Sequence, residues 1–178
     1  MMIGHAAIRI ADIVRNSIVD GPGIRYVVFV QGCKHKCKGC HNPQTHDLLG
    51  GHLVHTKKLM DEMTSDPLIS GLTISGGEPF EQAGCCAALA RLAKEAGKNV
   101  WCYTGYTYEF LNRFRYSQEL LNHIDVLVDG PYIEEERSLD LPFRGSRNQR
   151  IIDMNATREK GEVVLLKIGE DHEETDIN

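Results

Sequence analysis

Residues 24–30 read IRYVVFV, and the cysteine-bearing stretch QGCKHKCKGC follows directly at residues 31–40. The first stretch is rich in β-branched and aromatic residues, which predicts a strand. The second carries Cys33, Cys37 and Cys40, with three and then two residues between them. Thiolates are soft ligands that favour zinc or iron–sulfur centres, so this strand is expected to lead into a metal site.

Three more short apolar runs, at 71–75, 99–103 and 124–128, predict further strands. Helices are expected between them at 81–96 and 107–123. Strands that alternate with helices form βα units with right-handed crossovers. The sequence therefore predicts an α/β fold with a mostly parallel sheet.

Outside this central region the predicted elements are less regular. An edge strand is expected over 7–14, and a helix over 56–64 with Thr56 as its N-cap. Two more strand-like runs follow at 149–154 and 162–168. The intervening stretch before them has no clear period and is expected to be irregular.

The bulk composition fits one globular domain. The chain has 178 residues, a formal net charge of −5, and 42% hydrophobic and 25% charged residues. The negative charge argues against a general nucleic-acid binder, which needs a broad basic face. No apolar run approaches the ~20 residues that span a bilayer, so no membrane association is expected. We expect residues 1–169 to form a single domain and residues 170–178 to form an acidic, disordered tail.

The start of the chain, MMIGHAAIRIADIV, places a histidine and an arginine where a signal peptide needs its apolar stretch. We therefore expect a cytoplasmic protein, in which six cysteines do not form a disulfide framework. Cys85, Cys86 and Cys102 lie in apolar stretches and are expected to be small buried hydrophobes.

An unusual segment follows each of the four central strands. The cysteine loop follows the first, Gly-Gly-Glu-Pro at 76–79 follows the second, Thr104-Gly105 the third and Asp129-Gly130 the fourth. Because the carboxyl ends of parallel strands lie on one edge of a sheet, these segments are expected to converge on one site.

Only three thiolates are clustered in the cysteine loop. A structural zinc site needs four ligands, and a [4Fe–4S] cluster usually has four cysteines. A cluster held by Cys33, Cys37 and Cys40 would leave one iron free to bind the amino and carboxylate groups of S-adenosylmethionine (SAM). The alternative is zinc, with a nearby histidine as the fourth ligand. The candidates for that ligand are His35, His41 and His46.

Lysines alternate through the cysteine loop with no acid beside them. They would offset the negative charge of a cluster and attract an acidic electron donor, although each one alone is equally well read as a solvated lysine. The glycines after the second strand leave backbone groups accessible, which suits carbonyl contacts to the SAM ammonium group. A Gly-Gly pair alone indicates only a turn.

Two other features favour ligand binding. Thr104 and Asp129 are placed to reach the ribose or carboxylate of SAM, with a turn or cap role as the alternative for Asp129. Arg144, Arg147 and Arg150 fall within seven residues without an acid. This segment is either a solvated basic loop or a clamp for a carboxylate, a phosphate or a partner's chain terminus.

The C-x3-C-x2-C loop followed by GGEP resembles the radical SAM superfamily. DGPGIR at 20–25 and CHNP at 40–43 resemble the glycyl-radical-enzyme activases. Within these, YTGY at 103–106 and LPFRGSRNQR at 141–150 are similar to activating proteins of anaerobic ribonucleoside-triphosphate reductase. The resemblance covers residues 8–155.

The resemblance implies a partial (β/α) barrel of the radical SAM type, with a [4Fe–4S] cluster and SAM as cofactors. It assigns iron to Cys33, Cys37 and Cys40 and implies no catalytic acid or base. The SAM contacts expected from the resemblance and from strand position are Gly39, Cys40, His41, Gly76, Gly77, Glu78, Thr104 and Asp129. One residue departs from the superfamily, because the position before the third cysteine is usually aromatic. Here it is Gly39, which leaves the adenine contact to His41 or Tyr103.

The resemblance also implies the reaction. A 5′-deoxyadenosyl radical would take a hydrogen atom from a glycine of the large reductase subunit, with flavodoxin or a similar low-potential donor supplying the electron. Arg144, Arg147 and Arg150 would contact the reductase. The rival functions are activation of another glycyl-radical enzyme, small-molecule radical SAM chemistry such as deazaguanine synthesis, and a zinc-stabilised binding module without chemistry.

Overall fold

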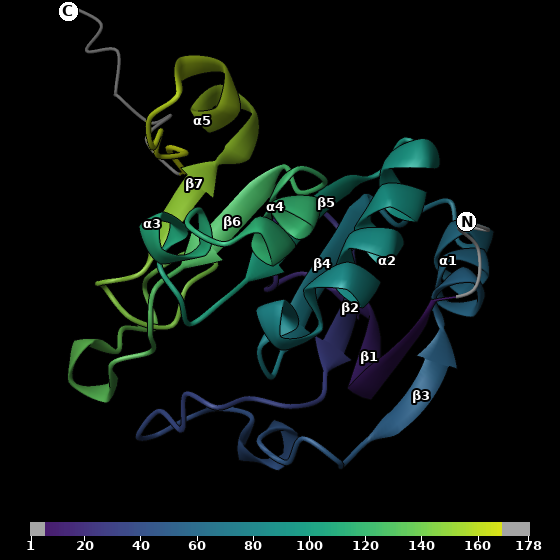
Figure 1. The fold of residues 1–178 in the computed structure, drawn as a ribbon, viewed down its shortest axis with the longest axis horizontal. Helices are drawn as coiled ribbons and strands as arrows, with labels where there is room; N and C mark the ends of the chain where they lie inside the picture. Colours follow the sequence, from purple (N-terminus) through teal and green to yellow (C-terminus); the bar gives the residue numbers. More distant parts are fainter. Residues whose placement is uncertain (1–5, 169–178) are drawn as a thin grey trace, which may run out of the picture.

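The computed structural model describes residues 6–168; the predicted tail at 170–178 lies outside this part of the chain. One mixed sheet runs through it, with the strand order β3-β1-β2-β4-β5-β6-β7 (Figure 1). The strands are β1 (Ala7–Ser17), β2 (Arg25–Val30), β3 (His52–His55), β4 (Gly71–Gly76), β5 (Asn99–Tyr103), β6 (Val126–Asp129) and β7 (Arg150–Asp153). The α-helices are α1 (Thr56–Ser65), α2 (Ala83–Glu95), α3 (Tyr108–Leu111), α4 (Arg115–Leu121) and α5 (Met154–Lys160). Short 3-10 helices occupy Pro43–Thr45, Pro79–Gln82 and Glu134–Glu136.

The four central strands, β2, β4, β5 and β6, are parallel, which confirms the mostly parallel sheet. Val30 at the end of β2 pairs with Gly76 at the end of β4, and Tyr103 at the end of β5 pairs with Val128. The carboxyl ends of these strands therefore lie along one edge of the sheet.

Antiparallel strands flank this parallel centre on both sides. β1 pairs with β2, β3 pairs with β1, and β7 pairs with β6. The prediction that the first strand lies at an edge was wrong, because β1 is covered by β3, a strand that was not predicted. Ile8 and Ile10 of β1 are completely buried in the main core.

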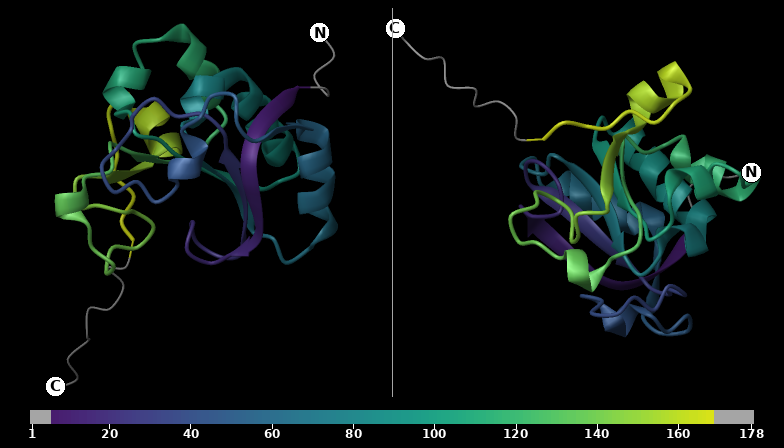
Figure 2. Two further views of the ribbon diagram at one scale, coloured as in Figure 1. Left: turned by 90° about the horizontal axis from the view of Figure 1, so that it is seen from below. Right: turned by 90° about the vertical axis from the view of Figure 1, so that its left-hand side faces the viewer.

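The helices α1, α2 and α4 lie against one face of the sheet, as the front view and the turned views agree (Figures 1 and 2). Val100 and Cys102 of β5 point into the main core on that face. Trp101, between them, belongs to a smaller cluster on the opposite face, because successive side chains of a strand alternate. Phe143 packs into that second cluster and so fastens the irregular 130–149 segment to the sheet.

Several predicted boundaries need correction. The expected helix over 107–123 is two short helices, because Phe114 between them is extended (φ −112°, ψ 126°). Thr56 is the first residue of α1, and His55 occupies its N-cap. The run at 162–168 forms only an isolated bridge, Leu165 to Ile152 of β7, instead of a strand.

The helix α5 was not predicted, although Asp153 caps its start by accepting a hydrogen bond from the Ala156 N–H, and Gly161 ends it with a left-handed conformation (φ 72°). No helix between residues 6 and 168 has the length and apolar character that crossing a bilayer requires.

Candidate cluster and cofactor site

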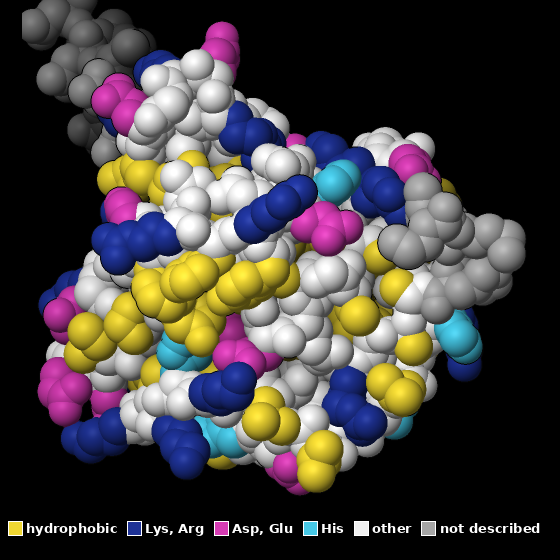
Figure 3. Space-filling model, in the orientation of Figure 1, with side chains coloured by type: hydrophobic (Ala, Val, Ile, Leu, Met, Phe, Trp, Pro, Cys, Tyr) yellow, Lys and Arg dark blue, Asp and Glu magenta, His cyan; other side chains and the backbone are white. Residues whose placement is uncertain are grey.

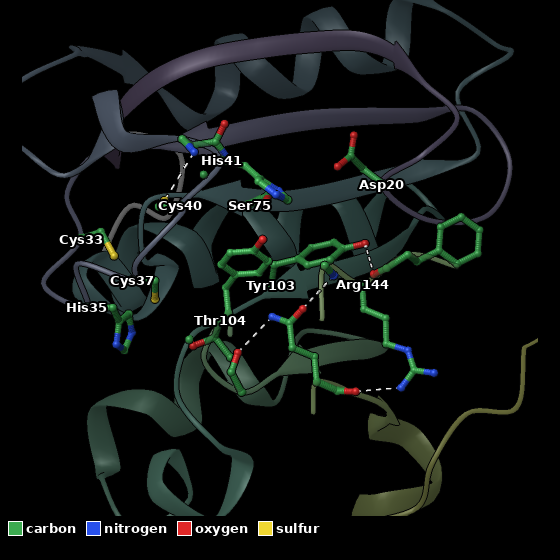
Figure 4. Close-up of a pocket in the computed structure, with 18 of the residues that line it drawn as sticks. Asp20, Cys33, His35, Cys37, Cys40, His41, Ser75, Tyr103, Thr104 and Arg144 are labelled. Carbon is green, nitrogen blue, oxygen red and sulfur yellow. Dashed lines mark hydrogen bonds between the residues drawn. The ribbon is translucent and has the colours of Figure 1, made fainter. Parts of the chain in front are cut away.

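A cleft of ≈ 380 Å³ opens at the carboxyl ends of the four parallel strands (Figure 4). The cleft is lined from all four of the motifs that follow these strands. The motif residues in its lining are Cys33, Cys37, Cys40, Gly76, Gly77, Thr104, Gly105 and Gly130. Figure 4 shows the three cysteines at one end of the cleft, with Asp20 and Arg144 toward the other end.

The cysteine loop presents its three thiols, all half-buried, to this cleft. The Cys40 N–H donates to the Cys37 carbonyl at 3.2 Å, and the Asn42 N–H donates to Cys40 Sγ at 3.4 Å. Desolvation raises the pKa of the Cys33 thiol, so its thiolate needs a positive partner to form. A set of three soft sulfur donors in a partly desolvated loop fits iron.

The remaining cysteines have a structural role. Cys86 and Cys102 are completely buried in the main core, and Cys85 packs against that core from α2. Within residues 6–168, no three histidine, cysteine, aspartate or glutamate side chains are grouped so as to hold one metal ion. The mononuclear zinc arrangement that the sequence left open is therefore not assembled in the described residues.

Of the histidines offered as zinc ligands, His35 is held in a socket formed by Glu78, Gly105 and Tyr106. Its Nε2 lies 2.8 Å from a carboxylate oxygen of Glu78, and its ring packs edge-on against Tyr106 with centroids 4.4 Å apart. A Cβ atom at Gly105 would come within 2.7 Å of the His35 ring. Glu78 raises the pKa of His35 through this hydrogen bond. Because Gly105, in the third motif, has no side chain, the His35 ring can pack directly against its backbone.

His41 lines the cleft and lies against Tyr132, with ring centroids 4.8 Å apart. His46 is the third candidate, and its Nε2 is buried without a hydrogen-bond partner among the described residues. The carbonyl of His46 accepts a hydrogen bond from the Cys33 N–H at 3.4 Å, so this residue supports the start of the cysteine loop through its backbone.

Glu78 is completely buried and does not line the cleft. One carboxylate oxygen accepts hydrogen bonds from the Phe80 N–H and the Thr104 hydroxyl, at 3.0 and 2.8 Å. The other accepts from the Gly105 N–H at 2.9 Å and faces His35. The carboxylate therefore joins the ends of β4 and β5 to the cysteine loop, and its contact with SAM stays a prediction.

Gly76 and Gly77 follow β4 where its backbone passes very close to β2. A Cβ atom at Gly76, whose φ is 100°, would lie 2.6 Å from Phe29 Cα, and one at Gly77 would lie 2.4 Å from the Gly32 carbonyl oxygen. No other residue fits in either place, and both glycines, which have no side chain, line the same cleft as the cysteines.

Gly39 is explained by a close neighbour. Its φ is 69°, and a Cβ atom there would lie 2.6 Å from a carboxylate oxygen of Glu134. Lys38 beside it forms ion pairs with Glu134 and Glu135, at 3.2 and 3.0 Å. The Glu134 side chain thus lies where the side chain of any other residue before the third cysteine would begin, and the positive φ favours glycine there. Gly39 does not line the cleft.

Asp129 is buried at the end of β6, with its carboxylate directed away from the cleft. Both carboxylate oxygens accept hydrogen bonds from the Arg150 guanidinium, at 2.9 and 2.5 Å, and one also accepts from the Tyr108 N–H at 2.7 Å. Arg150 also binds Glu109. Asp129 thus stands behind the cleft, and the half-buried Arg150 clamps it to Glu109; the cofactor contact of Asp129 and the partner contact of Arg150 stay predictions.

The other two arginines differ from Arg150. Arg144 lines the cleft; its NH1 donates to the Gln149 carbonyl at 2.9 Å, and its Nε is buried with no partner among the described residues. Arg147 is exposed. Only Arg144 of the three is thus placed to meet a ligand in the cleft.

Residues that sequence reasoning did not select also line the cleft, among them Asp20, Tyr132 and Phe143. Asp20 belongs to the DGPG segment, which was a usable signal. Tyr103 holds Phe143 over the cleft, because its hydroxyl donates to the Phe143 carbonyl at 2.8 Å. Burial raises the pKa of Tyr103, which keeps the phenol protonated as a donor.

Comparison with known proteins agrees with a cluster at this site. Residues 19–152 match the family model described as a 4Fe-4S single cluster domain. The chain is 41% identical to the anaerobic ribonucleoside-triphosphate reductase-activating protein of Vibrio cholerae, over 75% of this chain and 90% of the relative. It is 36% identical to the protein of that name from bacteriophage T4, over 75% and 86%, and 35% identical to that of Escherichia coli K12, over 74% and 90%.

The family match spans most of the chain and includes every residue of the cleft described above. The chain therefore belongs to the 4Fe-4S single cluster domain family that includes the anaerobic ribonucleoside-triphosphate reductase-activating proteins.

Proposed function

We propose that this protein is a radical SAM activase that generates a glycyl radical on the large subunit of an anaerobic ribonucleoside-triphosphate reductase. The names of its relatives support this partner. The proposal places the protein in the cytoplasm and gives it flavodoxin or a similar low-potential protein as electron donor. It treats residues 1–169 as one radical SAM domain whose open sheet is the partial (β/α) barrel of that superfamily.

The observation that carries the proposal is the meeting of three thiols with an open glycine backbone in one cleft. Cys33, Cys37 and Cys40 would each hold a different iron, so they need not converge on a single point. The fourth iron would be left for SAM. When bound, the reduced cluster supplies the electron that splits SAM into methionine and a 5′-deoxyadenosyl radical, which removes a hydrogen atom from a reductase glycine.

The other residues of the site bind and position. The backbone of Gly76 and Gly77 would lie along the methionyl end of SAM, while Thr104 and His41 line the remaining surface. Glu78 and Asp129 act from behind the cleft, the first by fixing the cysteine loop and the second by fixing the end of β6. No proton transfer is required, and the buried carboxylates of Glu78 and Asp129 behind the cleft are engaged in internal hydrogen bonds.

Anaerobic reconstitution with iron and sulfide tests this proposal, using Cys37→Ala and its matched control Cys85→Ala. The wild type and Cys85→Ala should bind about four iron and four sulfide per chain, and should form 5′-deoxyadenosine with dithionite and SAM. Cys37→Ala should lose both properties. With the reductase added, wild type should give a glycyl radical signal in electron paramagnetic resonance. One zinc without sulfide, or a cluster lost in Cys85→Ala, would overturn the proposal.

A further inference from the structure

A row of aromatic rings extends from the cysteine loop to the surface of α3 and α4. His35 packs against Tyr106 at 4.4 Å, and Tyr106 stacks on Phe110 at 4.9 Å with an interplanar angle of 12°. Phe110 then contacts Phe114 at 5.0 Å, and Phe114 contacts Tyr116 at 5.5 Å, all between ring centroids. We call these five residues the aromatic row.

The outer end of the aromatic row is open to solvent. Phe110, Phe114 and Tyr116 are 37%, 36% and 55% exposed. Figure 3 shows a patch of hydrophobic side chains on this face, over α3, with both basic and acidic side chains at its border. Adjacent exposed aromatic rings are characteristic of the centre of a protein–protein interface, where they supply most of the binding energy.

The break between α3 and α4 is what completes the aromatic row. In one continuous helix, residues 110 and 114 would share a face, but residue 116 would point elsewhere, because positions two apart do not face each other. The extended conformation of Phe114 turns the chain so that Tyr116 lies beside it. The departure from the predicted helix thus aligns the exposed rings instead of burying them.

Two arginines lie among the outer rings. Arg113 and Arg115 fall between Phe110 and Tyr116, while Glu109, one of the two acids that flank residues 110–118, is paired with Arg150. Between residues 6 and 168, neither the Arg113 nor the Arg115 side chain, nor that of Lys36 in the cysteine loop, has a hydrogen bond or ion pair. Free cations at the border of an apolar patch are complementary to an acidic partner.

The aromatic row reaches the cysteine loop from outside the cleft. His35 is the only member of the row found in the cleft lining that the structure describes. A partner seated on the outer rings would therefore leave the cleft open to SAM and to the reductase. An electron donor needs such an approach, because it must reach the cluster while the cleft is occupied.

We propose that Phe110, Phe114 and Tyr116 form the docking surface for an acidic one-electron carrier protein, which reduces the cluster through the His35 side of the cysteine loop. This inference rests on the proposed function. With flavodoxin as the carrier, the flavin hydroquinone anion loses one electron to become the neutral semiquinone, and the cluster gains that electron. No bond forms between the carrier and the aromatic row.

The test compares Phe114→Ala/Tyr116→Ala with a matched control, Leu53→Ala/Leu68→Ala, which removes two other exposed apolar side chains. Calorimetry measures the affinity for oxidised flavodoxin, and stopped-flow absorbance measures cluster reduction by reduced flavodoxin and, separately, by dithionite. The aromatic variant should bind flavodoxin at least about tenfold more weakly and be reduced by it correspondingly more slowly. Reduction by dithionite should be unchanged, and the control should behave as wild type.

A charge variant, Arg113→Glu/Arg115→Glu, keeps the test decisive if removal of the rings disturbs the fold. It should weaken flavodoxin binding by a similar factor and reduce the dependence of the affinity on salt. Wild-type affinity in this charge variant, or in a folded aromatic variant, would overturn the inference. So would normal flavodoxin binding together with weakened binding of the reductase, which would make the patch the reductase interface. Neither binding nor reduction uses SAM, so failure to cleave SAM would count against the proposed function alone.

Discussion

His35 ties the centre of the cysteine loop to the ends of β4 and β5. Its ring is enclosed by Glu78, Gly105 and Tyr106, and Lys34 beside it adds an ion pair to Glu81. Three motifs that look independent in the sequence therefore have one shared task, which is to fix the position of this side chain between two of the three thiols.

Gly105→Ala tests this socket directly. The new methyl group would meet the His35 ring at 2.7 Å, and overpacking of this kind costs about 1–3 kcal/mol of unfolding free energy. We expect His35 to be displaced and a reconstituted cluster to be lost faster to a chelator, measured by absorbance. Gly84→Ala is the matched control: nothing lies within 4 Å of its added methyl, and alanine favours its helix by about 0.5–1 kcal/mol.

A double-mutant cycle identifies the cause of any effect. If the methyl group acts through the ring, His35→Ala/Gly105→Ala should be no worse than His35→Ala alone, so the two changes would be strongly non-additive. Additive losses would mean that Gly105 matters for a reason other than its contact with His35. If the cluster were as stable in Gly105→Ala as in wild type, the proposed role of the His35 socket would be wrong.

The motifs in the sequence predicted which segments meet at the cleft, but not which of their side chains point into it. Cys33, Cys37 and Cys40 face the cleft, whereas Glu78 and Asp129, chosen as ligand contacts, face inward. Among the partners of these carboxylates, Thr104, Gly105 and Arg150 are distant in sequence. A spacing pattern carries no information on such partners, because they are set by how the strands are brought together.

Among the elements, the parallel strands were the most predictable. β2, β4, β5 and β6 are continuous apolar runs because both faces of the central sheet are covered. β3 was missed because HLVH is largely exposed and is a strand only through its pairing with β1. The helix over 107–123 was predicted as continuous because propensity gives no sign of the extended Phe114.

Asp125 links three secondary-structure elements, α2, β5 and α5, at the end of the sheet opposite the cleft. Its carboxylate accepts hydrogen bonds from Lys94 of α2 at 2.6 Å, the Val100 N–H of β5 at 2.8 Å, and Asn155 of α5 at 3.2 Å. We expect Asp125→Ala to lower the unfolding free energy by about 2–3 kcal/mol in urea denaturation at pH 7. Since the cleft is remote, SAM cleavage should be retained; its loss in the folded variant would contradict this separation.

The same residue gives a pH dependence with a defined sign. Burial would raise the pKa of Asp125, but the hydrogen bonds from Lys94, Val100 and Asn155 outweigh it and lower the pKa. A lowered carboxyl pKa stabilises the fold above the unfolded value of about 3.9, and that contribution is lost as the pH falls through the folded pKa. The stability gap between wild type and Asp125→Ala should therefore narrow at pH 3, and a gap that widens there would contradict the assignment.

At the scale of the whole molecule, the core and the cysteine loop are separate. The main core is built from the strands and from α1, α2 and α4, and it takes no residue from 31–51. The second cluster, around Trp101, holds the segment that closes the other side of the cleft. The sheet thus provides a fixed frame on which two irregular segments meet across the cleft, joined at Lys38 by its ion pairs to Glu134 and Glu135.

Removal of the cluster should therefore loosen the loop and leave the frame folded. Anaerobic hydrogen exchange, comparing reconstituted with chelator-treated protein, should find the amides of residues 32–46 exchanging at least about tenfold faster, or about 1.4 kcal/mol less protected. The amides of β4 and β5 should be almost unchanged, because their protection comes from core packing. Lys38→Met would show an intermediate effect in the loop, since it removes the tie to Glu134 and Glu135 but none of the thiols. Loss of protection throughout the sheet would mean instead that the cluster supports the whole fold, as a structural metal does in a small domain.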